Sequence, residues 1–174
     1  MNEVADIVTV VDYDPEWPAR FAEERVRLAE AFGDDAVLIE HIGSTSVPGL
    51  AAKPIIDVVV AARHLPLPVG RITAMEALGY EHLGEYGIAG RVYFRRRSPR
   101  PRTHHVHVYA AESDRIGDHL LLRDHLRAHP AEVARYAELK RTLASQQLDG
   151  AAFQSGKSAF IAETLERARR GGAV

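Results

Sequence analysis

Apolar residues first recur at helical spacing in the N-terminal part of the chain. Asp14-Pro15 forms a typical helix start, with an N-cap residue followed by proline at the first helical position. The pattern then predicts one amphipathic helix that ends near Gly33 and is built on Trp17, Phe21, Leu28 and Phe32.

Short β-branched and apolar runs predict a group of strands in the first two thirds of the chain. A helix over residues 71–78, stopped by Gly79, interrupts them, and a basic, proline-bearing turn over 97–102 separates the last two. The expected strands cover residues 7–11, 36–42, 55–61, 92–96 and 105–109.

From residue 114 onward the pattern is helical only. Pro130 opens the second of three expected helices, and Asp149-Gly150 separates the second from the third; they cover 116–128, 131–147 and 151–169. A mixed α/β part followed by a helical part predicts one α+β domain, with a core over 1–112 and a helical portion over 113–174.

The composition limits the classes of protein to which this chain can belong. The 174 residues suffice for one compact domain, and 46% of them are hydrophobic and 26% charged, as in ordinary globular proteins. A net charge of −2 makes nucleic acid an unlikely partner. With no cysteine, no signal-peptide pattern and no apolar run long enough for a membrane span, we expect a soluble, cytoplasmic protein.

A loop of small residues joins the two expected strands at 36–42 and 55–61. Gly43, Ser44, Thr45 and Ser46 open it, and residues of this size let backbone amides and hydroxyls approach phosphate oxygens closely. The loop lacks the Gly-Lys-Ser/Thr ending of a P-loop, and an ordinary tight turn between buried strands is the alternative.

Asp57 is a single carboxylate on an otherwise apolar strand. Alternate strand residues share a face, so Asp57 and Val59 point the same way. A buried carboxylate requires a compensating partner. A metal ion or a ligand cation would provide a functional partner, whereas loop amides or an arginine would provide a structural one.

The run Thr103-His104-His105-Val106-His107-Val108 places two histidines on one strand face. His105 and His107 lie two residues apart and suit a shared metal ion or phosphate, whereas His104 points the opposite way. Candidate phosphate-binding cations are Lys53, Lys157 and the pair Arg123 and Arg127, which share a helix face; surface ion pairs are the ordinary alternative for each of them.

These motifs together resemble the GrpB family along the whole chain. The resemblance is carried, in order, by VDYDPEWPARF, IEHIGSTSVPGLAAKPIIDVVV, LGY at 78–80, THHVHV, LLRDHLRAHP, YAELKRTLA and SGKSAFI. It implies a nucleotidyltransferase-like mixed β-sheet with flanking helices and a C-terminal helical segment. Some family members are fused to dephospho-CoA kinase, which hints at nucleotide- or CoA-related chemistry.

In the nucleotidyltransferase superfamily a Gly-Ser pair contacts the nucleotide phosphates, and a D-x-D/E pair on the next strand holds two metal ions. Gly43-Ser44 and Asp57 match this pattern, but Val59 stands where the second carboxylate is expected. Two-metal phosphoryl transfer depends on such carboxylates. The resemblance therefore implies a Mg²⁺ or Mn²⁺ site at Asp57, with His105 or His107 in place of a further acid.

Because Val59 replaces the expected second carboxylate, two functions remain open. One is metal-dependent nucleotidyl transfer to a small molecule, with Asp57 as the catalytic residue; the other is a non-catalytic module that binds a nucleotide or phospho-metabolite. A histidine-triad hydrolase is a weaker alternative, because Tyr109 replaces the third histidine, and a purely structural role is the simplest one. The sequence names neither the substrate nor the oligomeric state.

Overall fold

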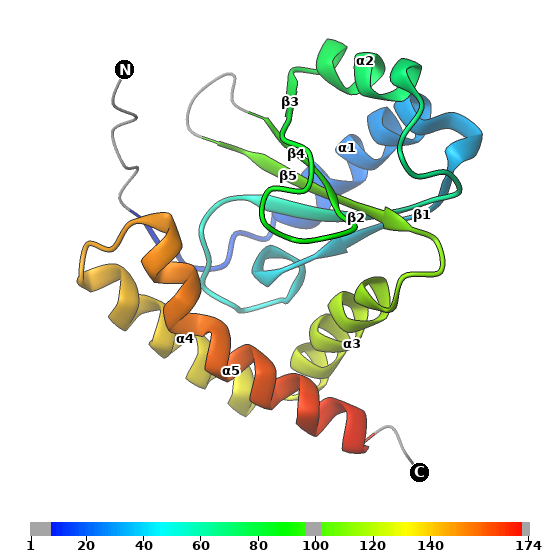
Figure 1. Cartoon of the computed structure of the whole chain (residues 1–174). Helices are drawn as coiled ribbons and strands as arrows, with labels where there is room; N and C mark the ends of the chain where they lie inside the picture. Colours follow the sequence, from blue (N-terminus) through cyan, green and yellow to red (C-terminus); the bar gives the residue numbers. More distant parts are fainter. Residues whose placement is uncertain (1–7, 97–101, 172–174) are drawn as a thin grey trace.

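The computed structural model of the chain describes residues 8–96 and 102–171 and contains one mixed sheet (Figure 1). Its five strands lie in the order β1-β2-β5-β4-β3. Strands β2 and β5 are parallel, and the other neighbouring pairs are antiparallel. The strands are β1 Ala36–Ile42, β2 Ile56–Ala62, β3 Tyr80–His82, β4 Val92–Arg96 and β5 His104–Ala110.

Helices lie on both sides of this sheet, with α1 and α2 on one side and α3, α4 and α5 on the other (Figure 1). Within the described ranges, no helix combines the length and apolar character that crossing a bilayer requires. The helices are α1 Trp17–Phe32, α2 Val69–Ala77, α3 Asp114–Ala128, α4 Pro130–Ser145 and α5 Gly150–Gly171, with short 3-10 turns at Gly33–Asp35 (η1) and Ser44–Ser46 (η2).

The sheet face beneath α1 and α2 carries the main hydrophobic core. Alternate residues of β2 and β5, such as Val58 and Val106, pack there against the apolar side of α1. Trp17, Leu28 and Phe32 of α1 are almost fully buried in this core. Burial of this apolar surface provides the main stabilisation of the α1 and α2 layer.

The opposite face is smaller in apolar area and more polar. Val59 and Ala61 of β2 pack there with Tyr109 and with Ile116 of α3. A separate cluster joins the loop after β1 to the helices, because Val47 and Leu50 pack against Leu126 of α3 and against α4. This second cluster positions the small-residue loop over the sheet.

Most of the elements predicted from the sequence are confirmed. The α+β class, the helix that ends at Gly33, the strands at 36–42 and 55–61 and the three C-terminal helices are present, with ends shifted by at most two residues. The first helix begins at Trp17 with Glu16 as its N-cap, so the predicted start at Asp14-Pro15 is two residues too early. Strand β3 was missed because three residues are too few for a periodic pattern. The predicted strand at 7–11 is wrong where it is described, since Val11 makes only an isolated bridge to Ala52. Most of the predicted turn at 97–102 lies outside the described residues.

A buried ion pair links α1 to strand β4 at the far end of the sheet. Glu24 accepts hydrogen bonds from Arg96 at 2.7 and 2.9 Å and from the Tyr80 hydroxyl at 3.0 Å. Burial by itself would raise the pKa of Glu24, but the hydrogen bonds and charge of Arg96 outweigh it and hold the pKa below its usual range. The Glu24 carboxylate is therefore charged in the folded state.

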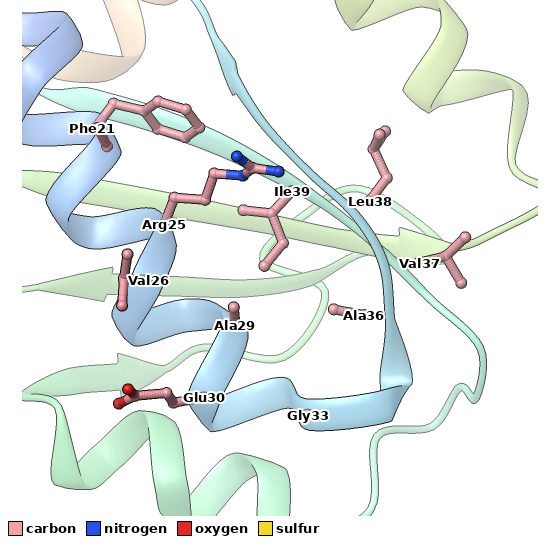
Figure 2. Close-up of a pocket in the computed structure, with 11 residues that line it drawn as sticks. Phe21, Arg25, Val26, Ala29, Glu30, Gly33, Ala36, Val37, Leu38 and Ile39 are labelled. Atoms are coloured by element: carbon pink, nitrogen blue, oxygen red, sulfur yellow. The ribbon is translucent and has the colours of Figure 1, made fainter.

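A pocket lies between α1 and the edge strand β1 (Figure 2). Its lining is mostly apolar and includes Phe21, Val26, Val37 and Ile39, with the guanidinium of Arg25 and the carboxylate of Glu30 at its sides. It contains none of the residues that the sequence proposes for phosphate or metal binding. The candidate functional site is therefore elsewhere, on the face that carries Asp57.

We predict that Glu24→Gln lowers the free energy of unfolding by about 3 kcal/mol at pH 7, because Arg96 loses its buried counter-charge. Since folding depresses the pKa of Glu24, the stabilisation is present above pH 4.5, the ordinary pKa of a glutamate, and is lost as the pH falls below it. Urea unfolding at several pH values measures this difference. The exposed neighbour variant Glu23→Gln is the control, and equal losses for both variants would contradict the assignment.

Candidate active site at Asp57

The pairing of β2 with β5 places Asp57 next to the histidine run. In this parallel register Asp57 lies beside His105, and Val59 lies beside His107. Alternate strand residues share a face, so Asp57, His105 and His107 project together, while His104 points to the opposite face near Glu24. The side-chain directions predicted from the sequence are confirmed.

Asp57 lies between the two histidine rings. Its Oδ1 atom is 3.2 Å from His105 Nδ1 and 3.6 Å from His107 Nε2. Burial by itself would raise the pKa of Asp57, but hydrogen bonds from His105 and His107, together with their electrostatic field, hold the pKa well below its usual range. Its side chain keeps 25% of its exposure, so the carboxylate is charged and reachable.

The contacts define the tautomers of both rings. A carboxylate only accepts, so His105 Nδ1 donates to Asp57. Arg91 only donates, so His107 Nδ1 accepts from its Nη1 atom at 3.3 Å, and the His107 proton resides on Nε2, facing Asp57. Burial lowers the pKa of His107 despite the nearby Asp57 charge, which agrees with a neutral ring.

In the neutral form of the His105 ring, with its proton on Nδ1, Nε2 carries an unshared electron pair. This atom is buried and has no hydrogen-bond partner among the described residues. The ring is held by Asp57 on one side and by the edge of Tyr93 on the other, with ring centroids 5.6 Å apart. A histidine oriented by a carboxylate through Nδ1 is an arrangement that serves metal ligation or proton transfer at Nε2.

The donor set decides which cation suits this site. A carboxylate with imidazole nitrogen fits Mn²⁺ better than Mg²⁺, which prefers oxygen ligands. His105 Nε2 has no partner among the described residues, whereas the electron pair of His107 is engaged by Arg91, so His107 would join a cation only after its ring reorients. As they stand, no three or more His, Cys, Asp or Glu side chains in the described ranges are grouped so that they could hold a metal ion. The expected Mg²⁺ or Mn²⁺ at Asp57, His105 and His107 stays a prediction, in which a cation would take most of its ligands from a bound phosphate and water.

Val59 stands where the superfamily resemblance led us to expect a second carboxylate. It is fully buried and packs with Ile42, Tyr109 and Ile116 beneath α3. A carboxylate at this position would be buried against Ile42, Tyr109 and Ile116, at a cost in free energy unless His107 beside it compensated the charge. The neighbourhood therefore favours an apolar residue, and a two-metal centre does not fit these residues.

The small-residue loop divides into exposed and buried members. Thr45 and Ser46 are buried and hold the loop together, since the Thr45 hydroxyl donates to the Ile55 carbonyl at 3.0 Å and the Ser46 hydroxyl donates to the Gly43 carbonyl at 2.6 Å. Gly43 is exposed and Ser44 is half-buried. Of the four phosphate-binding residues predicted in this loop, Gly43 and Ser44 are thus accessible, whereas the Thr45 and Ser46 hydroxyls form hydrogen bonds that stabilise the loop.

Gly43 is required by both backbone and packing. Its φ of +69° and ψ of −171° are strained for residues with a side chain. A Cβ atom there would lie 2.7 Å from Asp57 Oδ2. The loop therefore approaches the Asp57 carboxylate as closely as glycine alone permits.

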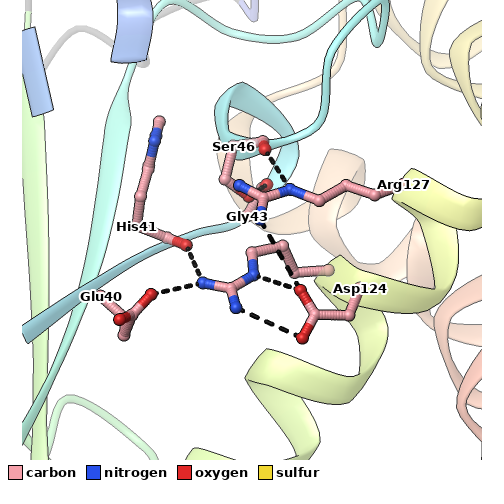
Figure 3. A network of polar contacts seen from close by, with 7 residues as sticks. Glu40, His41, Gly43, Ser46, Asp124 and Arg127 are labelled. Atoms are coloured by element: carbon pink, nitrogen blue, oxygen red, sulfur yellow. Dashed lines mark hydrogen bonds and ion pairs between the residues drawn. The ribbon is translucent and has the colours of Figure 1, made fainter. Parts of the chain in front are cut away.

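The arginine pair of α3 holds that loop and strand β1 (Figure 3). Arg123 donates to Glu40 at 2.7 Å and to the His41 carbonyl at 3.1 Å, and its remaining nitrogens contact Asp124. Arg127 donates to the Ser46 carbonyl at 2.9 Å. Both arginines thus anchor the site, and phosphate binding by them stays a prediction.

Three lysines from separate parts of the chain converge near Asp57. Lys53 of the loop and Lys157 of α5 lie over the same Phe153 ring, with Nζ-to-centroid distances of 4.8 and 5.0 Å. Lys140 of α4 lies over Tyr136 at 4.5 Å. The negative charge of Asp57 acts on all three amines. The site therefore carries an excess of cationic groups.

Sequence reasoning did not assign functional roles to several residues that complete this site. Arg91, Tyr93 and His119 surround the histidine pair, and Tyr136 and Lys140 lie on the helical side. The i, i+4 spacing of Tyr136 and Lys140 on one helix face was the available signal. For Arg91, Tyr93 and His119, only the three-dimensional arrangement reveals their proximity.

Comparison with known proteins gives the chain relatives along nearly its whole length. The chain is 43% identical over 164 residues to the UPF0157 protein YqkA of Bacillus subtilis, covering 94% of this chain and 48% of that protein, so it spans about half of that relative's length. A segment of a dephospho-CoA kinase from Mycolicibacterium paratuberculosis is 29% identical over 169 residues, covering 82% of this chain and 41% of the kinase.

A solved structure and a family model agree with these relatives. The crystal structure of conserved protein GrpB from Enterococcus faecalis matches with a TM-score of 0.87 and 39% identity, covering 94% of this chain and 98% of that one. The model of the family described as GrpB protein matches residues 7–167. The chain therefore belongs to the GrpB family.

Proposed function

We propose that this chain binds a nucleotide or another phosphorylated small molecule at the Asp57 site, which comprises Asp57, the two histidines, Gly43, Ser44 and the lysines Lys53 and Lys157. The observation that carries the proposal is the gathering of three lysines, which lie over the Phe153 and Tyr136 rings and interact electrostatically with Asp57. Like charges repel one another, so this arrangement is favoured by a ligand that brings several negative charges.

Each group has a defined part in this proposal. Gly43 lets the loop backbone approach the phosphate, Ser44 offers a hydroxyl, and Lys53 and Lys157 neutralise phosphate charge. Asp57 with His105 and His107 is the proposed place for one divalent cation of the Mn²⁺ type. Such a cation, when bound, supplies positive charge that screens the phosphate from the Asp57 carboxylate.

Nucleotidyl transfer is the second candidate, with Asp57 as the catalytic residue. The dephospho-CoA kinase relative supports it, because that enzyme contains a segment similar to this chain. The buried position of Val59 favours binding over two-metal catalysis. Release of pyrophosphate from a nucleoside triphosphate on turnover would establish the catalytic alternative, whereas stable binding without product is expected.

The proposal includes a small-molecule partner and a cytoplasmic location. The net charge of −2 favours neither nucleic acid nor an acidic membrane surface as the partner, and the absence of cysteine suits a reducing compartment. The nucleotidyltransferase-like character of the sheet remains part of this interpretation.

We predict that Asp57→Asn changes nucleotide affinity in opposite directions with and without metal. Without a divalent cation, loss of the negative charge removes repulsion and strengthens ATP binding by about three- to ten-fold. With Mn²⁺ present, the variant loses the strengthening that the metal gives the wild-type chain, about ten-fold or more. Calorimetric titration of ATP with EDTA and with Mn²⁺ measures both effects.

Asp118→Asn on α3 is the matched control, because it removes a carboxylate that pairs with Arg169 at the surface. Its affinity for ATP should equal that of the wild-type chain under both conditions. The proposal is contradicted if neither nucleotides nor phosphorylated metabolites bind in either condition, or if Asp57→Asn leaves both affinities unchanged.

We also predict that Gly43→Ala weakens ATP binding by about ten-fold or more, since the added Cβ would displace Asp57 or the loop. The strained backbone should also lower the free energy of unfolding by about 2 kcal/mol. Gly117→Ala is the control, because a Cβ at this helical position meets nothing within 4 Å. Calorimetry and thermal unfolding measure both quantities, and wild-type affinity in Gly43→Ala would rule out close approach of the ligand at this loop.

A further inference from the structure

Lys140 is a buried amine without a compensating partner. The residue is 2% exposed, and its Nζ atom has no hydrogen-bond partner among the described residues. Its described contact at Nζ is with the Tyr136 ring, 4.5 Å from the centroid. Burial of an unpaired ammonium is unfavourable, so stability alone does not account for a lysine at this position.

The surroundings of Lys140 are mostly cationic. Lys157 of α5 and Arg141 of its own helix disfavour its charged form, and Asp57 of β2 is the carboxylate that favours it. Burial, followed by these two cations, lowers the pKa of Lys140 to about 6. Burial likewise lowers the pKa of Lys157 to about 8, with Asp57 and Lys53 as its charged neighbours. A bound anion is the missing element that would restore the charge of both amines.

The Tyr136 side chain connects this lysine to the phosphate loop. Its hydroxyl is close enough to the Ser44 side chain for that group to counteract the rise in the pKa of Tyr136 that burial causes, and its ring stacks on Phe160 of α5 with centroids 4.5 Å apart. The Tyr136 ring that Lys140 covers is thereby fixed relative to both the loop and α5. Lys140, Ser44 and Lys157 thus belong to one connected arrangement, and Lys53 joins it through the Phe153 ring.

We propose that Lys53, Lys140 and Lys157, with Ser44, form a subsite for a polyphosphate chain, so that the ligand class of the site is a triphosphate and not a monophosphate. This inference rests on the proposed function and adds the part of the ligand that the lysines recognise. A single phosphate group carries about −1.5 to −2 charges near neutral pH. This charge falls short of balancing three ammonium groups, whereas a chain of phosphates would bring several negative charges to them.

The test is calorimetric titration of the intact chain with inorganic tripolyphosphate and with inorganic phosphate, at pH 7.5 and with EDTA. We expect tripolyphosphate to bind about a hundred-fold more tightly than phosphate. Lys140→Met and Lys157→Met should each weaken tripolyphosphate binding by about ten-fold or more. Arg135→Met is the matched control, because Arg135 is an exposed cation of the same helix, and its affinity should stay within about two-fold of wild type.

Thermal unfolding without ligand separates this role from a structural one. Since methionine removes the unpaired buried amine at similar volume, the Lys140→Met melting temperature should equal or exceed that of the wild-type chain. Tripolyphosphate should raise the wild-type melting temperature but leave that of Lys140→Met nearly unchanged. A Lys140→Met chain that unfolds at a lower temperature and still binds tripolyphosphate like wild type would overturn the proposal, and Lys157→Met repeats the binding test independently.

Titration with ATP and AMP identifies the source of the phosphate chain. Tighter binding of ATP than of tripolyphosphate assigns the subsite to a nucleoside triphosphate, whereas equal binding assigns it to the phosphate chain alone; AMP should bind as weakly as phosphate. If tripolyphosphate binds no better than phosphate, or if both lysine variants bind it like wild type, the subsite is refuted. The proposed function survives that result if a phosphorylated ligand still binds in a manner that depends on Asp57.

Discussion

The negative charge of Asp57, near the start of β2 on the more polar face of the sheet, is the constraint on which the rest of the site depends. Two histidine donors from β5 compensate it, and Arg91 determines the tautomer of one of them. The approaching loop must carry glycine at position 43 because a Cβ would collide with the carboxylate. The same charge acts on lysines from the loop, α4 and α5. One carboxylate thus determines the residues permitted in several segments.

The surrounding structure keeps these groups in place without taking part in binding. On the opposite face, the buried Glu24–Arg96 pair ties α1 to the sheet. On the site face, Arg123 and Arg127 hold strand β1 and the loop against α3. These arginines are engaged by protein acceptors, whereas Lys140 Nζ has no hydrogen-bond partner in the part of the chain that the structure describes. This contrast between paired arginines and an unpaired lysine is the strongest indication of where an anion binds.

Strand periodicity was enough to predict which residues share a face, so the grouping of Asp57 with Val59 and of His105 with His107 followed from the sequence. The parallel register of β2 and β5, which brings the two groups together, is a tertiary property with no local signal. The burial of Lys140 could not be predicted from the sequence either, because a lysine in a helix with many polar residues is ordinarily solvated. Only the packing of the helices shows that this lysine is buried. Arg123 and Arg127 were predicted to bind phosphate, but in the structure they donate hydrogen bonds to carboxylate and carbonyl groups of the protein.

The most direct test of the central claim is a crystal structure of this chain soaked with Mn²⁺ and a non-hydrolysable ATP analogue. We expect anomalous density from Mn²⁺ beside the Asp57 carboxylate, and phosphate oxygens of the analogue within hydrogen-bond distance of Lys140 and Lys157. A nucleotide bound elsewhere, such as in the pocket between α1 and β1, with the Asp57 site unchanged, would contradict it.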